Sequence, residues 1–424
     1  MPSPPSNYAF MTAHIINGPR SIRYLLPFFD WFILVAFVFT FYILAFLPSY
    51  WEMGNWDVLT FFILLWFFYL NLLRHPEWEF SSLQDTRLQA PENEGQFLRQ
   101  QRTKATSVLF SPRLQYIIIG EEHHDKTQPP DLYYADEVQY LVHLAWQLPL
   151  SYLALDVVHN YLVVKDPYWT NLEISWLEPY GSAAVLRTLV VGMSCWAFTS
   201  LLECIAGPCF LFAHLAGFLD RHWSPHMHRP AFGSPMHVLR RGVRGFWARG
   251  GFWHSFFIIA VTAPGHAFSD LFGLAEDQFE RYVWAALSGF GFSGLMHCGI
   301  VPREPLFANA SGGASAFHLK VCIFCFFMSQ PIALGIETLV AAIAKIIVGS
   351  QFWRRGFGYR LRLLVNAIWV ALWFVNATQP LGNALRQLGL FRFSPVPFSI
   401  VSWQSGDWSS VVERLQNSTM QAGA

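Results

Sequence analysis

The chain alternates long apolar runs with shorter polar stretches, and the lengths of these runs predict helices that cross a membrane. A transmembrane helix needs about 20 consecutive, mainly apolar residues. Seven runs approach this length, at residues 28–47, 57–73, 138–157, 184–203, 282–300, 318–343 and 363–380. The pattern therefore predicts an all-α, polytopic integral membrane protein.

Two shorter apolar runs leave the expected number of transmembrane helices at seven to nine. Residues 205–218 follow the preceding run closely, so 184–218 is either two helices or one broken or extended helix. Residues 252–263 end at Pro264-Gly265, which favours a re-entrant or interfacial segment that does not fully cross.

Basic residues are concentrated in two of the polar stretches, and this sets the expected orientation of the chain. Residues 74–136 contain seven Lys or Arg residues and residues 219–250 contain six. The 48–56 and 160–183 loops together contain one, Lys165. Because cytosolic loops carry an excess of positive charge, we expect the N-terminus and both basic stretches in the cytosol.

The same pattern predicts a simple domain organisation. We expect a cytosolic segment at 1–27, a membrane-embedded domain at 28–390 and a C-terminal tail at 391–424. The first 20 residues lack a basic stretch followed by an apolar one, so a cleaved signal peptide is not expected. The first apolar run would then direct insertion, which predicts an integral protein of the endoplasmic reticulum.

Composition supports the membrane assignment and excludes one class of partner. Hydrophobic residues make up 53% of the chain and charged residues 13%, whereas a soluble domain carries about 25% charged residues. Lys+Arg and Asp+Glu are both 28, so the net charge of +0 provides no basic surface for nucleic acid. We expect the chain to be embedded in the lipid bilayer.

No metal site is expected. Cys322 and Cys325 form a CxxC pair, but no second pair or histidine cluster accompanies it, and structural zinc requires about four ligands. The best alternative metal site is the GEEHHDK stretch at 120–126, which contains three carboxylates around His123 and His124. The neighbouring prolines favour a solvated turn there.

The run SGFGFSGLMHCG, from Ser288 to Gly299, contains the strongest candidate for chemistry. His297 lies in an apolar segment, where an ionisable side chain is expensive to desolvate and is a functional candidate by default. The alternative is a structural hydrogen bond to a neighbouring helix. Preceding glycines and serines would let another helix or a substrate chain approach closely, and a buried neutral imidazole can accept a proton.

A second candidate is His254, in the segment GFWARGGFWHSFF at 245–257. Trp247 and Trp253 fit an interfacial aromatic belt, whereas His254, at the membrane edge beside a short helix, fits that interpretation less well. Of the other polar groups, Glu337 is the deepest carboxylate, and Asp156 lies at a helix end where it could cap or face the interface.

These residues lie within segments that resemble a known family. The run WSPHMHRPAFGSP, from Trp223 to Pro235, the pairs Phe246-Trp247 and Trp253-His254, and SGLMH at 293–297 look like the wax-synthase-like branch of the membrane-bound O-acyltransferase (MBOAT) family. The resemblance is firmest over 223–345. One departure is that five residues separate the two aromatic pairs where the family pattern has three, so the SGLMH element is the firmer match.

The resemblance implies a reaction and roles for these side chains. His297 would be the general base that takes the proton of an acceptor hydroxyl, and His254 would orient the substrate or help stabilise the oxyanion. Arg240, Arg241 and Arg244 would receive the phosphates of coenzyme A. Acetyl-CoA, or another acyl-CoA, would be a cosubstrate, and no permanently bound cofactor or metal is implied.

The expected acceptor also follows from the resemblance. The loop patterns look like those of fungal members, which often acetylate terpenoid or meroterpenoid hydroxyls in secondary-metabolite biosynthesis. We therefore expect an acetyltransferase acting on a lipophilic small-molecule alcohol. Other relatives make wax esters from long-chain alcohols, and long-chain wax ester synthesis remains the alternative within the family.

Three alternative functions, each different from acyl transfer, stay open. A membrane terpene cyclase would need an acid, for which Glu337 or Asp156 are the candidates, and would not need acyl-CoA. A proton-coupled transporter would use His297 and Glu337 as a pair, but it predicts inverted repeats that the sequence does not display. A catalytically inactive scaffold is the third, and the presence of both His254 and His297 argues against it.

Overall fold

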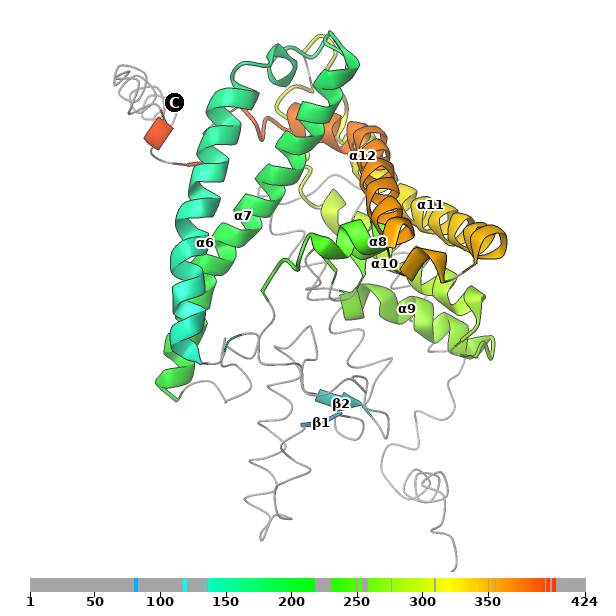
Figure 1. The fold of residues 1–424 in the computed structure, drawn as a ribbon. Helices are drawn as coiled ribbons and strands as arrows, with labels where there is room; N and C mark the ends of the chain where they lie inside the picture. Colours follow the sequence, from blue (N-terminus) through cyan, green and yellow to red (C-terminus); the bar gives the residue numbers. More distant parts are fainter. Residues whose placement is uncertain are drawn as a thin grey trace, which may run out of the picture. The chain divides into compact units, whose positions relative to one another are not determined.

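The computed structural model describes much of the chain from residue 136 onward and two short strands before it (Figure 1). The described residues are 80–82, 117–119, 134, 136–217, 230–248, 251–253, 258–275, 277–308, 310–349, 351–354, 356–392, 394–396 and 399–401. The expected spans 28–47 and 57–73, the segment 1–27 and the 120–126 cluster lie outside them. All described elements belong to one compact unit, Pro48–Ala424.

The described part is helical apart from one strand pair, β1 (Phe80–Ser82) antiparallel to β2 (Ile117–Ile119). The helices are α6 (Glu137–Val157), η3 (Val158–Val163), η4 (Pro167–Trp169), α7 (Gly181–Leu215), α8 (Met236–Trp247), α9 (Ile258–Leu271), α10 (Phe279–Cys298), α11 (Ala316–Val348), η7 (Phe352–Arg354) and α12 (Gly356–Gln387). This architecture confirms the all-α, polytopic membrane class.

Four of these helical segments are long and apolar enough to cross a membrane. They are Glu137–Val163, which joins α6 to η3, and helices α7, α11 and α12. Helix α7 is continuous over 35 residues with Pro208 inside it, so the extended-helix alternative for 184–218 is the correct one. Helix α10 coincides closely with the expected span at 282–300.

Helix α9 differs from the expectation at its C-terminal end. The run at 252–263 was expected to stop at Pro264-Gly265, but α9 continues through both residues to Leu271. The reason lies in α10, where the Ser288 hydroxyl accepts the Gly265 N–H at 3.0 Å and donates to the Val261 carbonyl at 2.8 Å. Ser288 thus bridges the backbone groups next to the proline, and the helix persists.

The described part of α9 has 14 residues and extends about 21 Å at 1.5 Å per residue. Residues 254–257 before it lie outside the described residues, so the re-entrant segment stays a prediction. Helix α10 contacts both α9 and α11, α6 contacts α7, and α12 contacts α8, α11 and α7 (Figure 1). The candidate base, His297, is at the end of α10, which contacts α11, and α11 in turn contacts α8.

Candidate functional site

The structure holds His297 by a hydrogen bond within its own helix. Its Nδ1 lies 2.7 Å from the Ser293 carbonyl oxygen, one turn earlier in α10. Because a carbonyl only accepts hydrogen bonds, the proton of the neutral imidazole is on Nδ1. Nε2 then carries a lone pair and is a proton acceptor. Ser293 was not predicted as this partner, although a carbonyl four residues earlier lies within reach of a side chain on the same helix.

The His297 ring packs against Phe327 of α11, with ring centroids 4.5 Å apart and planes at 30°. Gly294 permits this approach, since a Cβ there would lie 3.0 Å from Phe324 Cδ2 and 3.1 Å from Phe327 Cβ. A Cβ at Gly289 would lie 3.1 Å from Thr262 Cγ2 of α9. These two glycines therefore admit neighbouring helices, the first of the two uses expected for them.

An aromatic cluster connects the C-terminal end of α8 with the surroundings of His297. We define the aromatic cluster by its rings at Phe246, Trp247, Trp253, Phe290 and Phe326. Trp253 stacks on Phe246 at 5.2 Å and 17°, while Trp247 lies 5.5 Å from Phe290 and 6.4 Å from Phe326. Phe326 is in turn 5.2 Å from Phe327, the ring that contacts His297.

A reversal of the backbone after α8 brings Trp253 into this cluster. The N–H of Phe252 donates to the Gly245 carbonyl at 3.0 Å, and the N–H of Trp253 donates to the Phe246 carbonyl at 2.8 Å. Trp247 and Trp253 are both half-buried. The two tryptophans therefore pack against aromatic side chains of helices. The sequence pattern had favoured an interfacial aromatic belt for them.

His254, the second expected catalytic residue, follows Trp253 directly and lies outside the described residues.

Glu337 fixes the break in α8. Helix α8 changes direction at Gly242, whose φ is +66°. The Glu337 carboxylate accepts the N–H groups of Val243 at 2.5 Å and Arg244 at 2.9 Å, and the Trp369 indole N–H at 2.8 Å. It therefore acts as a cap, supplied from α11, for the second half of α8.

These contacts bear on the alternatives that needed a free acid. The Glu337 oxygens are occupied by the α8 backbone and Trp369. Asp156 is fully buried, accepts the Asn160 amide at 2.7 Å and the Val401 N–H at 3.0 Å, and so ties the C-terminal segment to α6. Structural roles for both carboxylates argue against the cyclase and the transporter.

Of the two asparagines Asn366 and Asn376 in α12, one joins two helices. The Asn366 side-chain amide donates to the Leu239 carbonyl at 2.9 Å and joins α12 to α8. The Asn376 amide donates to the Leu372 carbonyl of its own helix at 2.7 Å. Gln330 is a further polar link that the sequence analysis missed, since its Oε1 accepts the indole N–H groups of Trp247 at 3.1 Å and Trp373 at 3.2 Å.

The three arginines expected at the phosphates of coenzyme A are exposed on α8. Arg240 donates to the Tyr359 hydroxyl at 3.3 Å, and Arg244 donates to the Thr338 hydroxyl at 2.6 Å. Within the described part of the chain, no carboxylate forms an ion pair with Arg240, Arg241 or Arg244. Arg244 nevertheless interacts electrostatically with Glu337 and lies over the Tyr282 ring, with 5.6 Å to the centroid.

Comparison with known proteins supports a class for this site. The model of the Membrane bound O-acyl transferase family matches residues 228–326, which include α8, α9, α10 and the first third of α11. The match supports a membrane-bound O-acyltransferase, a class of enzyme that uses acyl donors and acceptors in a lipid environment. No curated protein matches the chain, and no solved structure does.

Proposed function

We propose that the protein is an acyl-CoA-dependent O-acyltransferase in which His297 is the general base. The observation that carries this proposal is the 2.7 Å contact between His297 Nδ1 and the Ser293 carbonyl, which assigns the lone pair to Nε2. Its place within the 228–326 match links the proton acceptor to acyl transfer.

The reaction balances with one base and no covalent enzyme intermediate. Nε2 takes the proton of the acceptor hydroxyl as its oxygen attacks the thioester carbonyl. The tetrahedral intermediate expels the thiolate of coenzyme A as the carbon–sulfur bond breaks, and the imidazolium returns the proton to that sulfur. The Ser293 carbonyl stabilises the imidazolium through Nδ1–H. His254 would orient the substrate or stabilise the oxyanion.

The substrates are proposed from the sequence resemblance. Acetyl-CoA is the acyl donor, with its phosphates at Arg240, Arg241 and Arg244, and no resident cofactor or metal takes part. The acceptor is a lipophilic terpenoid or meroterpenoid alcohol of secondary metabolism, which reaches the site from the bilayer of the endoplasmic reticulum. The wax-synthase-like assignment also keeps long-chain wax ester synthesis as the alternative.

The test uses microsomes that contain matched amounts of the wild type, His297→Ala, His297→Asn or His254→Ala. Radiolabelled acetyl-CoA, or a longer acyl-CoA, is supplied with a lipid extract of the native organism. We expect a labelled ester from the wild type and a loss of about 10²-fold or more in both His297 variants. The Asn side chain can still donate to the Ser293 carbonyl, so His297→Asn separates the loss of the base from the loss of packing.

The matched control is His214→Asn, at the C-terminal end of α7, which should leave the ester yield unchanged. Equal label in the wild type and His297→Asn would disprove the role of His297. Absence of label with every acyl-CoA would contradict acyl transfer itself and favour the cyclase, which does not need a thioester.

A further inference from the structure

A polar cavity of about 240 Å³ lies where the α6–α7 loop meets α11 and α12. The loop, α11 and α12 all line it, and the lining residues include Glu173, Cys322, Gln379, Asn383, Arg386 and Gln387. His297 is not among them. The volume is below the roughly 300–1,000 Å³ of pockets that hold drug-sized ligands, so the cavity suits a small group.

The α12 side of the cavity is a row of amides at i, i+4 and i+8. They are Gln379, Asn383 and Gln387, and residues at this spacing share one face of a helix. Gln387 Oε1 accepts the backbone N–H of Ala314 at 2.7 Å, so its amide nitrogen is the end left for a ligand. Polar residues in a membrane-spanning helix are expensive and mark functional sites.

The Asn383 side chain, like that of Gln387, has its carbonyl oxygen bonded within the protein and its amide nitrogen left as a donor. Burial raises the pKa of Tyr168, so its hydroxyl stays protonated and donates to Asn383 Oδ1 at 2.5 Å. With both carbonyl ends engaged by the protein, the amide donors of Asn383 and Gln387 remain. The row therefore offers hydrogen-bond donors and favours a ligand rich in acceptor oxygens.

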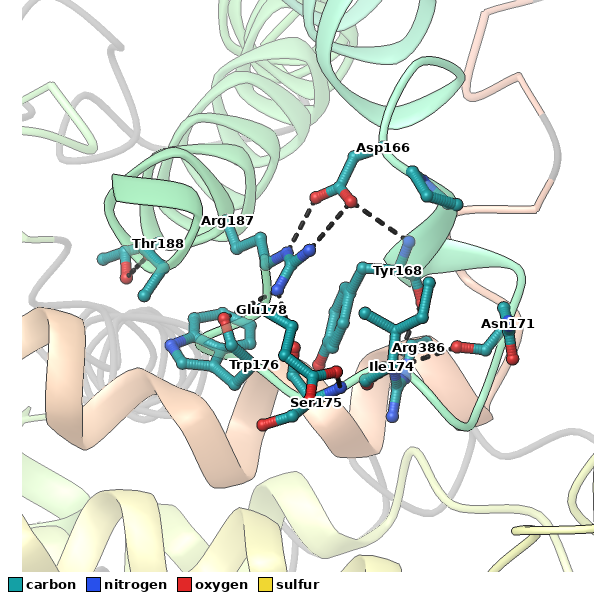
Figure 2. A network of polar contacts seen from close by, with 12 residues as sticks. Asp166, Tyr168, Asn171, Ile174, Ser175, Trp176, Glu178, Arg187, Thr188 and Arg386 are labelled. Atoms are coloured by element: carbon teal, nitrogen blue, oxygen red, sulfur yellow. Dashed lines mark hydrogen bonds and ion pairs between the residues drawn. The ribbon is translucent and has the colours of Figure 1, made fainter. Parts of the chain in front are cut away.

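Two guanidinium groups, Arg386 at the cavity and Arg187 behind it, stack on one ring, and the nearby carboxylates Glu173 and Glu178 are exposed. Figure 2 shows the Tyr168 ring between two guanidinium groups, Arg187 at 4.1 Å and Arg386 at 3.9 Å from the ring centroid. Asp166 is paired with Arg187 through contacts of 2.7 and 2.9 Å. Asp166 also attracts Arg386, so one carboxylate serves two cations, and Arg386 forms no ion pair among the described residues.

Arg386 is only 5% exposed, and its neighbours leave part of its hydrogen-bonding capacity unused. One terminal nitrogen donates to the carbonyls of Tyr168, Asn171 and Ile174 (Figure 2). Its Nε is buried with no acceptor in the described structure. A buried, incompletely paired charge is costly, and an anion in the adjoining cavity would reduce that cost. The carboxylate that lines the cavity, Glu173, is exposed and screened by water.

We propose that this cavity binds a small carboxylate, whose oxygens accept from the α12 amides beside the charge of Arg386. The site is separate from acyl transfer, and the proposal does not depend on that activity. A free organic acid and the headgroup of a fatty acid share this chemistry, and the test distinguishes them.

Cys322 lines the cavity and serves as a built-in reporter. Full-length protein in nanodiscs is treated with an anionic (sulfonatoethyl) or a cationic (trimethylammonioethyl) methanethiosulfonate, and modification of Cys322 is followed by peptide mass spectrometry. We expect the anionic reagent to react faster by about tenfold, because the buried charge of Arg386 at the cavity attracts anions more strongly than the exposed Glu173 repels them. Acetate should slow this reaction, and the neutral isostere acetamide should not.

Gln379→Glu is the test variant, since it adds a negative charge to the row with little change in shape. It should remove both the preference for the anionic reagent and the protection by acetate. The matched control is Asn376→Asp, one turn earlier, where the side chain bonds only its own helix and lies outside the cavity. It should behave as the wild type.

Thermal unfolding gives a second measurement that is independent of thiol reactivity. Acetate should raise the Tm of the wild type and of Asn376→Asp, but not that of Gln379→Glu. Stronger protection by laurate than by acetate supports a lipid-borne carboxylate, and equal or weaker protection supports a free acid. If acetamide matches acetate in both measurements, or if the cationic reagent reacts faster, the proposal is wrong.

Discussion

Removal of the buried Arg187 guanidinium should strongly destabilise the protein. Arg187 is fully buried in α7 and makes two contacts with Asp166. It also donates to the carbonyls of Ser175 at 2.8 Å and Trp176 at 2.6 Å (Figure 2). Arg187→Met would leave the Asp166 charge without its partner, which costs about 3–5 kcal/mol.

The double variant Arg187→Met/Asp166→Leu separates this charge effect from the other contacts. With neither charge present, the ion-pair component should be recovered. The Ser175 and Trp176 carbonyls would still lack a donor, and the Tyr168 N–H would lose the Asp166 oxygen that accepts it at 3.1 Å, which costs about 1 kcal/mol for each group. We therefore expect the double variant to be less stable than the wild type and more stable than Arg187→Met.

The assay is reversible unfolding in mixed detergent micelles, with the free energy of unfolding measured for the wild type, both single variants and the double variant. Arg187→Lys is the conservative variant. It keeps a charge but lacks the planar fork that contacts Asp166 through two nitrogens, so intermediate stability is expected. If Arg187→Met lies within about 0.5 kcal/mol of the wild type, the reasoning about this buried pair is refuted.

Two further predictions concern the helices around His297. Glu337→Ala should lower the free energy of unfolding by about 3 kcal/mol, because Val243 N–H, Arg244 N–H and the Trp369 indole lose their acceptor; Glu337→Gln, which keeps one oxygen, should lose less, and equal unfolding curves for both would contradict the capping role. Gly294→Val should reduce ester formation about tenfold or more at matched abundance by shifting α11 relative to His297. Gly335→Val, where a Cβ meets nothing within 4 Å, is the control, and equal activity of the two would contradict the packing argument.

Local patterns predicted most of the described helices correctly, because apolar length and spacing are physical properties of short segments. Apolar length alone located α6, α10, α11 and α12. The misplaced end of α9 shows the limit of such rules. By local rules a helix ends before Pro264. The Ser288 hydroxyl of α10 bonds the backbone groups of Gly265 and Val261 instead, so the helix continues. Ser288 lies 23 residues after Gly265, beyond the reach of a local rule.

The candidate site also contains some contacts that local sequence spacing indicates and others that it does not. The hydrogen bond from His297 to Ser293 follows helical spacing and was within reach of the sequence. The Glu337 cap on α8 and the Arg187–Asp166 pair join residues that are 93 and 21 positions apart. No periodicity links them, so tertiary packing alone specifies these partners.

Tertiary contacts give different roles to ionisable residues that have similar surroundings in the sequence. Glu337, Asp156 and His297 were all polar residues within or at the ends of apolar helices. The first two have oxygens occupied by backbone N–H groups, and those bonds hold helix or chain ends in place. His297 instead uses one nitrogen for its own helix, which leaves Nε2 as the acceptor. Among these three residues, the imidazole is therefore the group whose hydrogen bonding is compatible with taking a proton from a substrate.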